Sequence, residues 1–284
     1  MSIDFGITLQ AGPMRLAVRP DLGGSLAGLW HGDLPVMRST EPGLLRGPRQ
    51  SACFPLLPYS NRLGHRRFEW RGKRYTTLSN FDDSPHSLHG VGWLRVWQLV
   101  QQTSDRLSLR YTHTPDGHWP FAFEAEQDIQ LTPHALQLVL RLRNTDAQEQ
   151  PVGLGWHPFF PKRDSSRLQV NVASRWERDA LMLPTHATDQ QAIDAPVQAL
   201  DLDHCFGGWP GVAHIRDTHF ALRLSSTLPY LVVFTPPRLL HFCVEPVSHV
   251  NNAIQHAAPA SQGLVALAPG VVTTATLTLD VEAT

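Results

Sequence analysis

The chain has 284 residues, of which 42% are hydrophobic and 17% are charged, and its formal net charge at pH 7 is −1. This composition is typical of a folded globular protein with enough apolar residues for a large core. A near-neutral chain lacks the basic surface of a nucleic-acid-binding protein, so we expect no nucleic-acid partner. No apolar run approaches the roughly 20 residues of a membrane-spanning helix, so we expect no membrane partner.

Three cysteines, Cys53, Cys205 and Cys243, are too few and too widely spaced for a disulfide framework or a CxxC metal site. Free thiols suit a reducing compartment. The first residues, MSIDFGITLQAGP, lack the basic and apolar segments of a secretory signal. The sequence therefore predicts a cytoplasmic protein.

Alternation of apolar and polar residues predicts strands along the chain, because successive side chains of a strand point to opposite faces. A hairpin is expected at 68–77, FEWRGKRYTT, with Gly72 near its turn. Further strands are expected at 106–113, 121–131, 134–144 and 273–281.

The segment at 183–201, LPTHATDQQAIDAPVQALD, is the least strand-like part of the chain, and we expect a long loop there with room for one helical turn. Helical periodicity is scarce elsewhere, and 23 prolines and 20 glycines lie between the predicted strands, where turns need them. No linker or repeat divides the chain. The sequence therefore predicts one all-β domain over residues 1–284, built from two packed sheets.

Two polar segments in the first third of the chain are candidate binding elements. Asn61 and Arg62, within 54–70, can hydrogen-bond a polar ligand such as a sugar, although a solvated turn is the simpler interpretation. His86 and His89 are followed by Trp93, an aromatic residue of the kind that lines small-molecule pockets. Zinc needs three or four ligands, and no HxH or HExxH pattern completes this histidine pair, so we predict no metal site.

Two titratable residues in apolar surroundings are candidate acid and base groups. His157 lies in GLGWHPFFP (153–161), where it is either a packed core histidine or a proton donor. Glu245 lies in the apolar strand LHFCVEPVSHVNN (240–252) and is a candidate inward-facing carboxylate. A buried carboxylate without a partner is costly, so such a residue usually has a partner or a function.

Several motifs together resemble those of the aldose 1-epimerase (galactose mutarotase) family. In chain order they are NRLG (61–64) with FEWRGKRY, HSLHGVGW, GWHPFF, LDHCF (202–206), VEP (244–246) and LAPG (267–270). The resemblance implies a large antiparallel β-sandwich of the galactose mutarotase-like supersandwich type. It also implies interconversion of the α and β anomers of an aldose without a cofactor, with a small-molecule sugar as the partner.

The resemblance implies three catalytic residues. Glu245 matches the base that takes the proton of the sugar O1 hydroxyl, and His157 matches the acid that protonates the ring oxygen. His89 matches a second active-site histidine that hydrogen-bonds the sugar near the reacting centre. Trp156, Pro158 and Phe159 are then expected to fix the His157 imidazole and to lower its pKa by excluding water.

Three further residues are implied to bind the substrate. Arg62 matches an arginine that binds a sugar hydroxyl, and Asn61 is its neighbour in the same signature. Asp203 matches an aspartate that holds sugar hydroxyls.

The sequence departs from the common family pattern near the catalytic pair, which leaves the identity of the sugar open. The departures are Phe159, Pro161, Val247 and the pair Asn252 and Ala253.

Two alternative functions and the oligomeric state also stay open. A hexose-6-phosphate 1-epimerase is suggested by the basic cluster His65, Arg66, Arg67, Arg71, Lys73 and Arg74. A non-catalytic carbohydrate-binding protein on the same scaffold is the other alternative. A monomer and a homodimer are equally compatible with the sequence.

Overall fold

The structure is a computed structural model that describes residues 6–82 and 84–284. Strands joined by turns and short 3-10 helices make up the described chain, which confirms the all-β prediction. No helix among these residues is long and apolar enough to cross a membrane.

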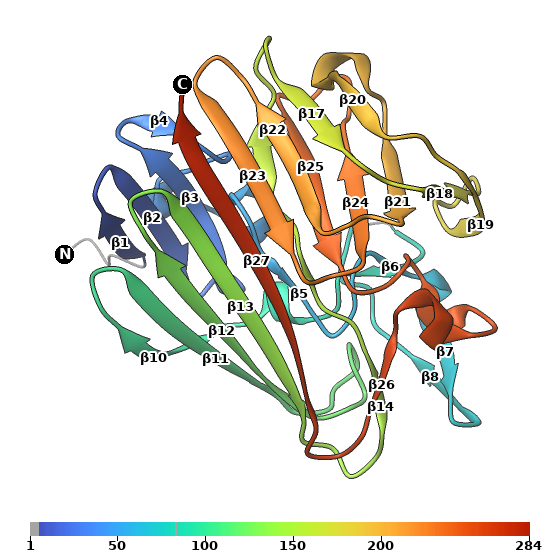
Figure 1. Cartoon of the computed structure of the whole chain (residues 1–284). Helices are drawn as coiled ribbons and strands as arrows, with labels where there is room; N and C mark the ends of the chain where they lie inside the picture. The colour runs from blue at the N-terminus through green and yellow to red at the C-terminus, as the bar shows by residue number, and fades with distance from the viewer. Residues whose placement is uncertain (1–5, 83) are drawn as a thin grey trace.

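The larger sheet has nine strands, and every neighbouring pair in it is antiparallel. In spatial order its strands are β10 (Gln98–Gln102), β11 (Arg106–His113), β12 (Phe123–Leu131), β13 (Ala135–Asn144), β27 (Val272–Ala283), β23 (Phe220–Ser226), β22 (Val212–Arg216), β17 (Arg167–Val170) and β20 (Ile193–Pro196). Strands β11, β12, β13 and β27 confirm the four strands predicted from alternation. Figure 1 shows β27 between β13 and β23 in this sheet.

The second sheet has eight strands and lies behind the first in Figure 1. In spatial order it contains β19 (Pro184–Asp189), β18 (Ser174–Arg178), β21 (Asp203–Gly207), β24 (Tyr230–Phe234), β25 (His241–Val247), β15 (Gly155–Trp156) and β5 (Pro55–Leu56), and β16 (Phe159–Pro161) also pairs with β25.

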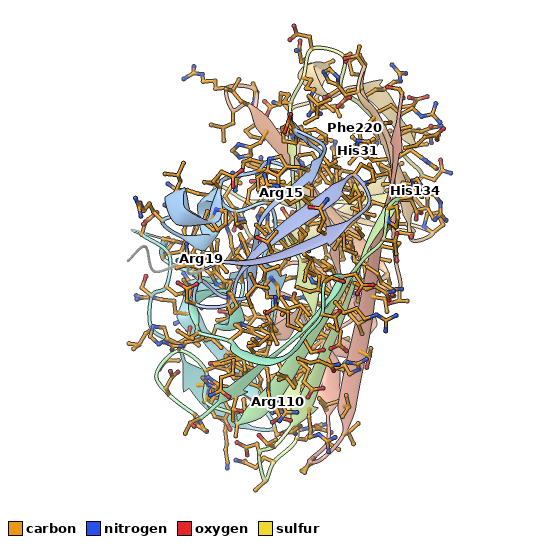
Figure 2. The ribbon with its side chains drawn as sticks, turned by 90° about the vertical axis from the view of Figure 1, so that its left-hand side faces the viewer. Arg15, Arg19, His31, Arg110, His134 and Phe220 are labelled. Atoms are coloured by element: carbon orange, nitrogen blue, oxygen red, sulfur yellow. The ribbon has the colours of Figure 1, made fainter. Side chains whose placement is uncertain are left out.

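A third sheet, which the sequence did not predict, closes one end of the molecule. Its strands are β1 (Ile7–Ala11), β2 (Met14–Arg19), β3 (Ser25–His31) and β4 (Leu34–Pro35). Its apolar residues, among them Leu16 and Leu29, join the same core as the two larger sheets. His31 of β3 packs edge-on against Phe220 of β23, with ring centroids 6.1 Å apart (Figure 2).

Small ladders and short helices complete the fold. The ladders are β14 (Gln150–Val152) with β26 (Val265–Leu267), β6 (Arg62–Leu63) with β9 (Ser87–Leu88), and the predicted hairpin β7 (Arg67–Trp70) with β8 (Lys73–Thr76). The 3-10 helices are η1 (Pro42–Leu44), η2 (Pro48–Gln50), η3 (Gly64–Arg66), η4 (Gly92–Leu94), η5 (Val197–Ala199), η6 (Ala253–Gln255) and η7 (Pro259–Gln262).

The main core lies between the two large sheets, as predicted. Leu138 and Leu140 of β13 share one buried cluster with Phe242 and Val244 of β25, because alternate residues of each sheet point toward the other. The opposite face of the eight-stranded sheet carries a second buried cluster, which we call the outer-face cluster. Its members are Phe54, Leu56, Trp93, Phe159, Cys205, Val232, Cys243, Val247 and Val250.

The prediction of a long loop at 183–201 is wrong for most of that segment. Two strands, β19 and β20, occupy it, followed by the single helical turn η5 that the prediction allowed. Both strands lie at sheet edges. Most residues of β19 are exposed or half-buried, so this strand lacks the half-buried face that produces an alternating pattern.

Two buried residues, Gly90 and His249, make backbone contacts with the loop between β5 and β6. Gly90 forms a parallel bridge with Leu57, and a Cβ on Gly90 would lie 2.1 Å from the Leu57 carbonyl oxygen. His249 accepts a hydrogen bond from the Ser60 backbone N–H at its Nε2 (3.1 Å) and donates one from Nδ1 to the Val250 carbonyl (2.7 Å). Both ring nitrogens are therefore used, and burial lowers the pKa of His249 to about 4.

We expect Gly90→Ala to destabilise the fold by more than about 2 kcal/mol, because a left-handed conformation and a backbone clash act together. Gly90 has φ +65°, and the clashing atom is backbone and cannot rotate away. Gly72→Ala is the matched control, since Gly72 has φ +74° but no atom within 4 Å of the added Cβ. The control should lose only about 1 kcal/mol in urea unfolding, and equal losses in both variants would contradict this interpretation.

We expect the free energy of unfolding to decrease as the pH is lowered from about 6.5 to about 4, partly because of His249. In this window the unfolded chain binds a proton that the folded His249 rejects, so acid favours unfolding. His249→Gln should reduce the slope by about 1.4 kcal/mol per pH unit. Urea unfolding at several pH values measures this slope, and His219→Gln, at an exposed histidine, is the control. An unchanged slope in His249→Gln would show that His249 takes no part.

Candidate active site

A cavity of about 350 Å³ opens on the outer face of the eight-stranded sheet, over the outer-face cluster. Its wall includes all six residues that the sequence predicted as site residues: Asn61, Arg62, His89, His157, Asp203 and Glu245. Trp93, the predicted pocket aromatic, also lines it. These residues come from chain segments nearly two hundred positions apart, and the fold brings all of them to one place.

Strand alternation places the two carboxylates of the cavity. In β25, Phe242 and Val244 enter the main core, so Glu245 points to the outer face. In β21, Phe206 enters the main core and Asp203 lines the cavity. Glu245 is therefore buried, as predicted, but it faces away from the core between the two sheets.

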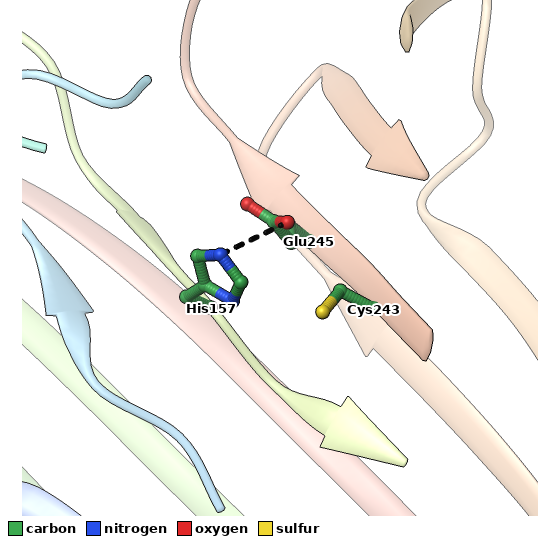
Figure 3. Close-up of side chains that lie close together, drawn as sticks. All are labelled: His157, Cys243 and Glu245. Atoms are coloured by element: carbon green, nitrogen blue, oxygen red, sulfur yellow. Dashed lines mark ion pairs between the residues drawn. The ribbon is translucent and has the colours of Figure 1, made fainter. Parts of the chain in front are cut away.

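His157 follows β15 and faces Glu245 across the cavity floor. Its Nε2 lies 3.3 Å from Glu245 Oε1, as Figure 3 shows. The side chain of Glu245 is 3% exposed and that of His157 is 13% exposed, so the imidazole retains a small opening to the cavity. His157 therefore lies at the wall of the cavity and outside the main core.

The aromatic residues around His157 differ in part from the prediction. The imidazole stacks on Phe159 with centroids 4.3 Å apart, as expected, and it also packs against Phe54 at 4.7 Å. Trp156 instead points into the main core, because it has the opposite strand parity. The Arg38 guanidinium packs on the other face of the Phe159 ring, with its Cζ atom 3.6 Å from the ring centroid.

Burial shifts both members of the pair toward their uncharged forms. Exclusion of water raises the pKa of Glu245 well above its usual range, and the nearby Asp203 carboxylate adds to the shift while Arg62 opposes it. Exclusion of water lowers the pKa of His157 well below its usual range, with further contributions from His89 and Arg38. Loss of hydration is thus the main cause of both shifts.

His89 is fixed by a reciprocal contact with Asn61. The Asn61 backbone N–H donates to His89 Nδ1 (3.1 Å), and the His89 backbone N–H donates to the Asn61 carbonyl (2.8 Å). Since Nδ1 is an acceptor, the neutral ring carries its proton on Nε2 and can donate a hydrogen bond. Burial and the charge of Arg62 lower the pKa of His89 to about 3, so the ring is neutral near pH 7.

Arg62 and Asp203 form the polar wall of the cavity. The Asn61 side-chain carbonyl accepts hydrogen bonds from the Arg62 backbone N–H (2.9 Å) and from Arg62 Nη1 (3.1 Å), which orients the guanidinium. Asp203 is held by an ion pair with Arg178, at 2.7 Å between Arg178 Nη1 and Asp203 Oδ2.

Arg38, Phe54 and Arg178 were not predicted as site residues, since no local sequence pattern connects them to the site. Arg38 and Phe54 line the cavity, and the Arg38 guanidinium donates to the Ser51 carbonyl at 3.0 Å. Cys243 was also missed, although a usable signal existed. It stands two residues before Glu245 in a strand, and that spacing places both side chains on one face.

Other sequence candidates lie outside the cavity. Both ring nitrogens of His86 are occupied, because Nδ1 accepts from the His65 N–H (2.9 Å) and Nε2 lies 3.0 Å from the Leu181 carbonyl oxygen. Four members of the basic cluster, His65, Arg67, Arg71 and Arg74, line a different groove. Among the described residues, the side chains grouped closely enough to hold a metal ion are those of His157, Cys243 and Glu245.

The departures from the common family pattern have different places in the structure. Phe159 and Val247 belong to the outer-face cluster. Asn252 has a structural role, because its side-chain oxygen accepts a hydrogen bond from the Gly64 backbone N–H at 2.9 Å.

Comparisons with known proteins agree with this fold. The sequence model of the aldose 1-epimerase family matches residues 6–280. The Escherichia coli K12 protein YphB, which is itself uncharacterized, is 33% identical over 293 residues, covering 97% of this chain and 98% of YphB. A crystal structure of a candidate aldose 1-epimerase from the same organism superposes with a TM-score of 0.88 at 31% identity, covering 98% of this chain and 99% of that one. A galactose mutarotase-like protein from Clostridium acetobutylicum has the same fold, with a TM-score of 0.87 at 18% identity over 98% of this chain and 95% of its own. The chain belongs to the aldose 1-epimerase family.

Proposed function

We propose that the protein is an isomerase that interconverts the α and β anomers of an aldose, with Glu245 and His157 as its acid–base pair. The observation that supports this most directly is the placement of His157 Nε2 3.3 Å from Glu245 Oε1 at the floor of a cavity. The cavity volume of about 350 Å³ falls within the range of small-molecule sites.

The reaction needs one group that accepts a proton and one that donates a proton. Ionised Glu245 takes the proton of the O1 hydroxyl, the bond between C1 and the ring oxygen breaks, and protonated His157 gives its proton to the ring oxygen. Rotation about the bond between C1 and C2 then presents the other face of the aldehyde. The ring closes as both proton transfers reverse, so the enzyme returns to its starting state and no cofactor is consumed.

The electrostatics of the pair favour the ring-opened stage of this cycle. Ring opening leaves Glu245 protonated and His157 neutral, and both pKa shifts favour that arrangement. The total charge of the pair does not change during the step. Ring opening therefore converts a charged pair into a neutral one inside a site from which water is excluded.

The polar wall supplies the contacts that orient the sugar. His89 donates from Nε2 near the reacting centre, and Arg62 donates to a hydroxyl group. Asp203 accepts hydrogen bonds from hydroxyls while its ion pair with Arg178 holds it in place. Asn61 acts through its neighbours, since it orients both His89 and Arg62.

The hexose-6-phosphate alternative receives little support. Arg71 and Arg74 of the basic cluster pair with Glu149 and Glu69, and the cluster does not line the cavity. The cationic side chain of Arg49 does line the cavity, but it already pairs with Asp82 at 2.6 Å.

We expect Glu245→Gln and His157→Asn each to reduce the protein-dependent rate of anomer exchange about 100-fold or more, since each removes one of two proton-transfer groups. Polarimetry of freshly dissolved α-glucose and α-galactose measures the rate against buffer alone. Glu69→Gln on the exposed hairpin is the control and should retain the wild-type rate.

A panel of free and 6-phosphorylated aldoses, followed by anomer-exchange NMR, separates the alternatives. Wild-type protein at the buffer rate for every sugar would refute the proposal. If calorimetry then detected sugar binding, the non-catalytic carbohydrate-binding function would replace it. Faster exchange of the phosphorylated sugars would support the hexose-6-phosphate activity.

A further inference from the structure

Cys243 lies beside the acid–base pair but has no part in the proposed reaction. It precedes Glu245 by two residues in β25, and both side chains project from the same face of the strand toward His157 (Figure 3). Cys205 and Cys243 are far apart in sequence, yet both belong to the outer-face cluster beneath the cavity.

Three potential metal ligands converge at this point. One ligand atom each from His157, Cys243 and Glu245 lie within 4.8 Å of one another. The ligand atoms around a tetrahedral zinc ion stand about 3.3–3.7 Å apart, given bonds of about 2.0–2.3 Å. The distance of 3.3 Å between His157 Nε2 and Glu245 Oε1 already fits that spacing. The limit of 4.8 Å exceeds the tetrahedral spacing, so zinc binding requires the three side chains to move closer together.

The chemistry of the three ligands favours zinc over magnesium and calcium. One imidazole, one thiolate and one carboxylate are a ligand set that zinc accepts, whereas magnesium and calcium prefer oxygen ligands alone. His157 and Glu245 line the cavity, which provides an entry path for the ion and a place for a water as fourth ligand. His157 Nδ1 is buried and has no hydrogen-bond partner among the described residues.

We propose that His157, Cys243 and Glu245 form a zinc-binding site and that zinc inhibits the enzyme there. Coordination occupies the nitrogen and the carboxylate that the reaction needs, so the metal-bound protein cannot transfer protons to a sugar. Binding converts the Cys243 thiol to a thiolate and releases its proton to solvent. Inhibition rests on the proposed function, whereas metal binding does not.

The binding is tested with Co²⁺, which replaces Zn²⁺ and gives near-ultraviolet charge-transfer absorption when a thiolate coordinates it. The wild-type protein should show this absorption, and addition of Zn²⁺ should abolish it. Cys243→Ser should lack it, while Cys205→Ser, which removes another buried thiol of the outer-face cluster, should retain it. Cys243→Ala gives a second test if the serine variant does not fold, and Mg²⁺ should not displace Co²⁺.

The inhibition is tested by measuring anomer exchange with increasing Zn²⁺. Cys243→Ser should keep the basal rate but need at least about tenfold more Zn²⁺ for half inhibition, since even outer partners of a metal site change affinity tenfold or more. A chelator should restore the wild-type rate. A wild-type protein without the Co²⁺ absorption, or equal sensitivity of wild type and Cys243→Ser to Zn²⁺, would overturn the proposal. If no sugar is epimerised, the Co²⁺ measurement still decides whether the site exists.

Discussion

Burial of both faces of β25 in the eight-stranded sheet is the constraint on which the rest of the structure depends. A strand has only two faces, and β25 uses one for the main core and the other for the cavity floor. Val244 and Glu245 are neighbours in sequence, yet one stabilises the sandwich and the other faces the ligand space. The packing that holds the fold together therefore also fixes the direction of the carboxylate, because a slip of one residue would exchange the two faces.

The same burial determines the electrostatics of the site. Glu245 and His157 are removed from water by Phe54, Phe159 and the strand itself, so neither can hold its charge as readily as in solution. A protein that needed only stability would place apolar side chains here, since a buried ionisable pair seldom repays its lost hydration. Asn61, Arg62 and Asp203 line the same cavity as the pair, and the charges of Asp203 and Arg62 shift the pKa of Glu245 in opposite directions.

The sequence predicted four strands of the nine-stranded sheet, β11, β12, β13 and β27, because their buried residues alternate with more exposed ones, as in β12. It failed at β19, where most of the strand is exposed, and β25 is recognisable only as a run of buried residues. All six predicted site residues line the cavity. They could be predicted because they stand in motifs that resemble those of the family. Arg38 and Phe54 could not be predicted, since they reach the site through tertiary contacts. Trp156 was predicted to pack against His157, but its side chain points to the opposite face of the strand, into the main core.

The reciprocal hydrogen bonds between Asn61 and His89 have a consequence for how the sequence can change. Both residues adopt left-handed backbone conformations, with φ of 56° and 60°, which costs about 1–2 kcal/mol for each residue that carries a Cβ. Glycine at either position would relieve that strain, but it would remove a side chain that faces the cavity. Stability and activity thus oppose each other at these two positions. Selection for thermal stability alone would alter them early, whereas selection for activity keeps the strained pair.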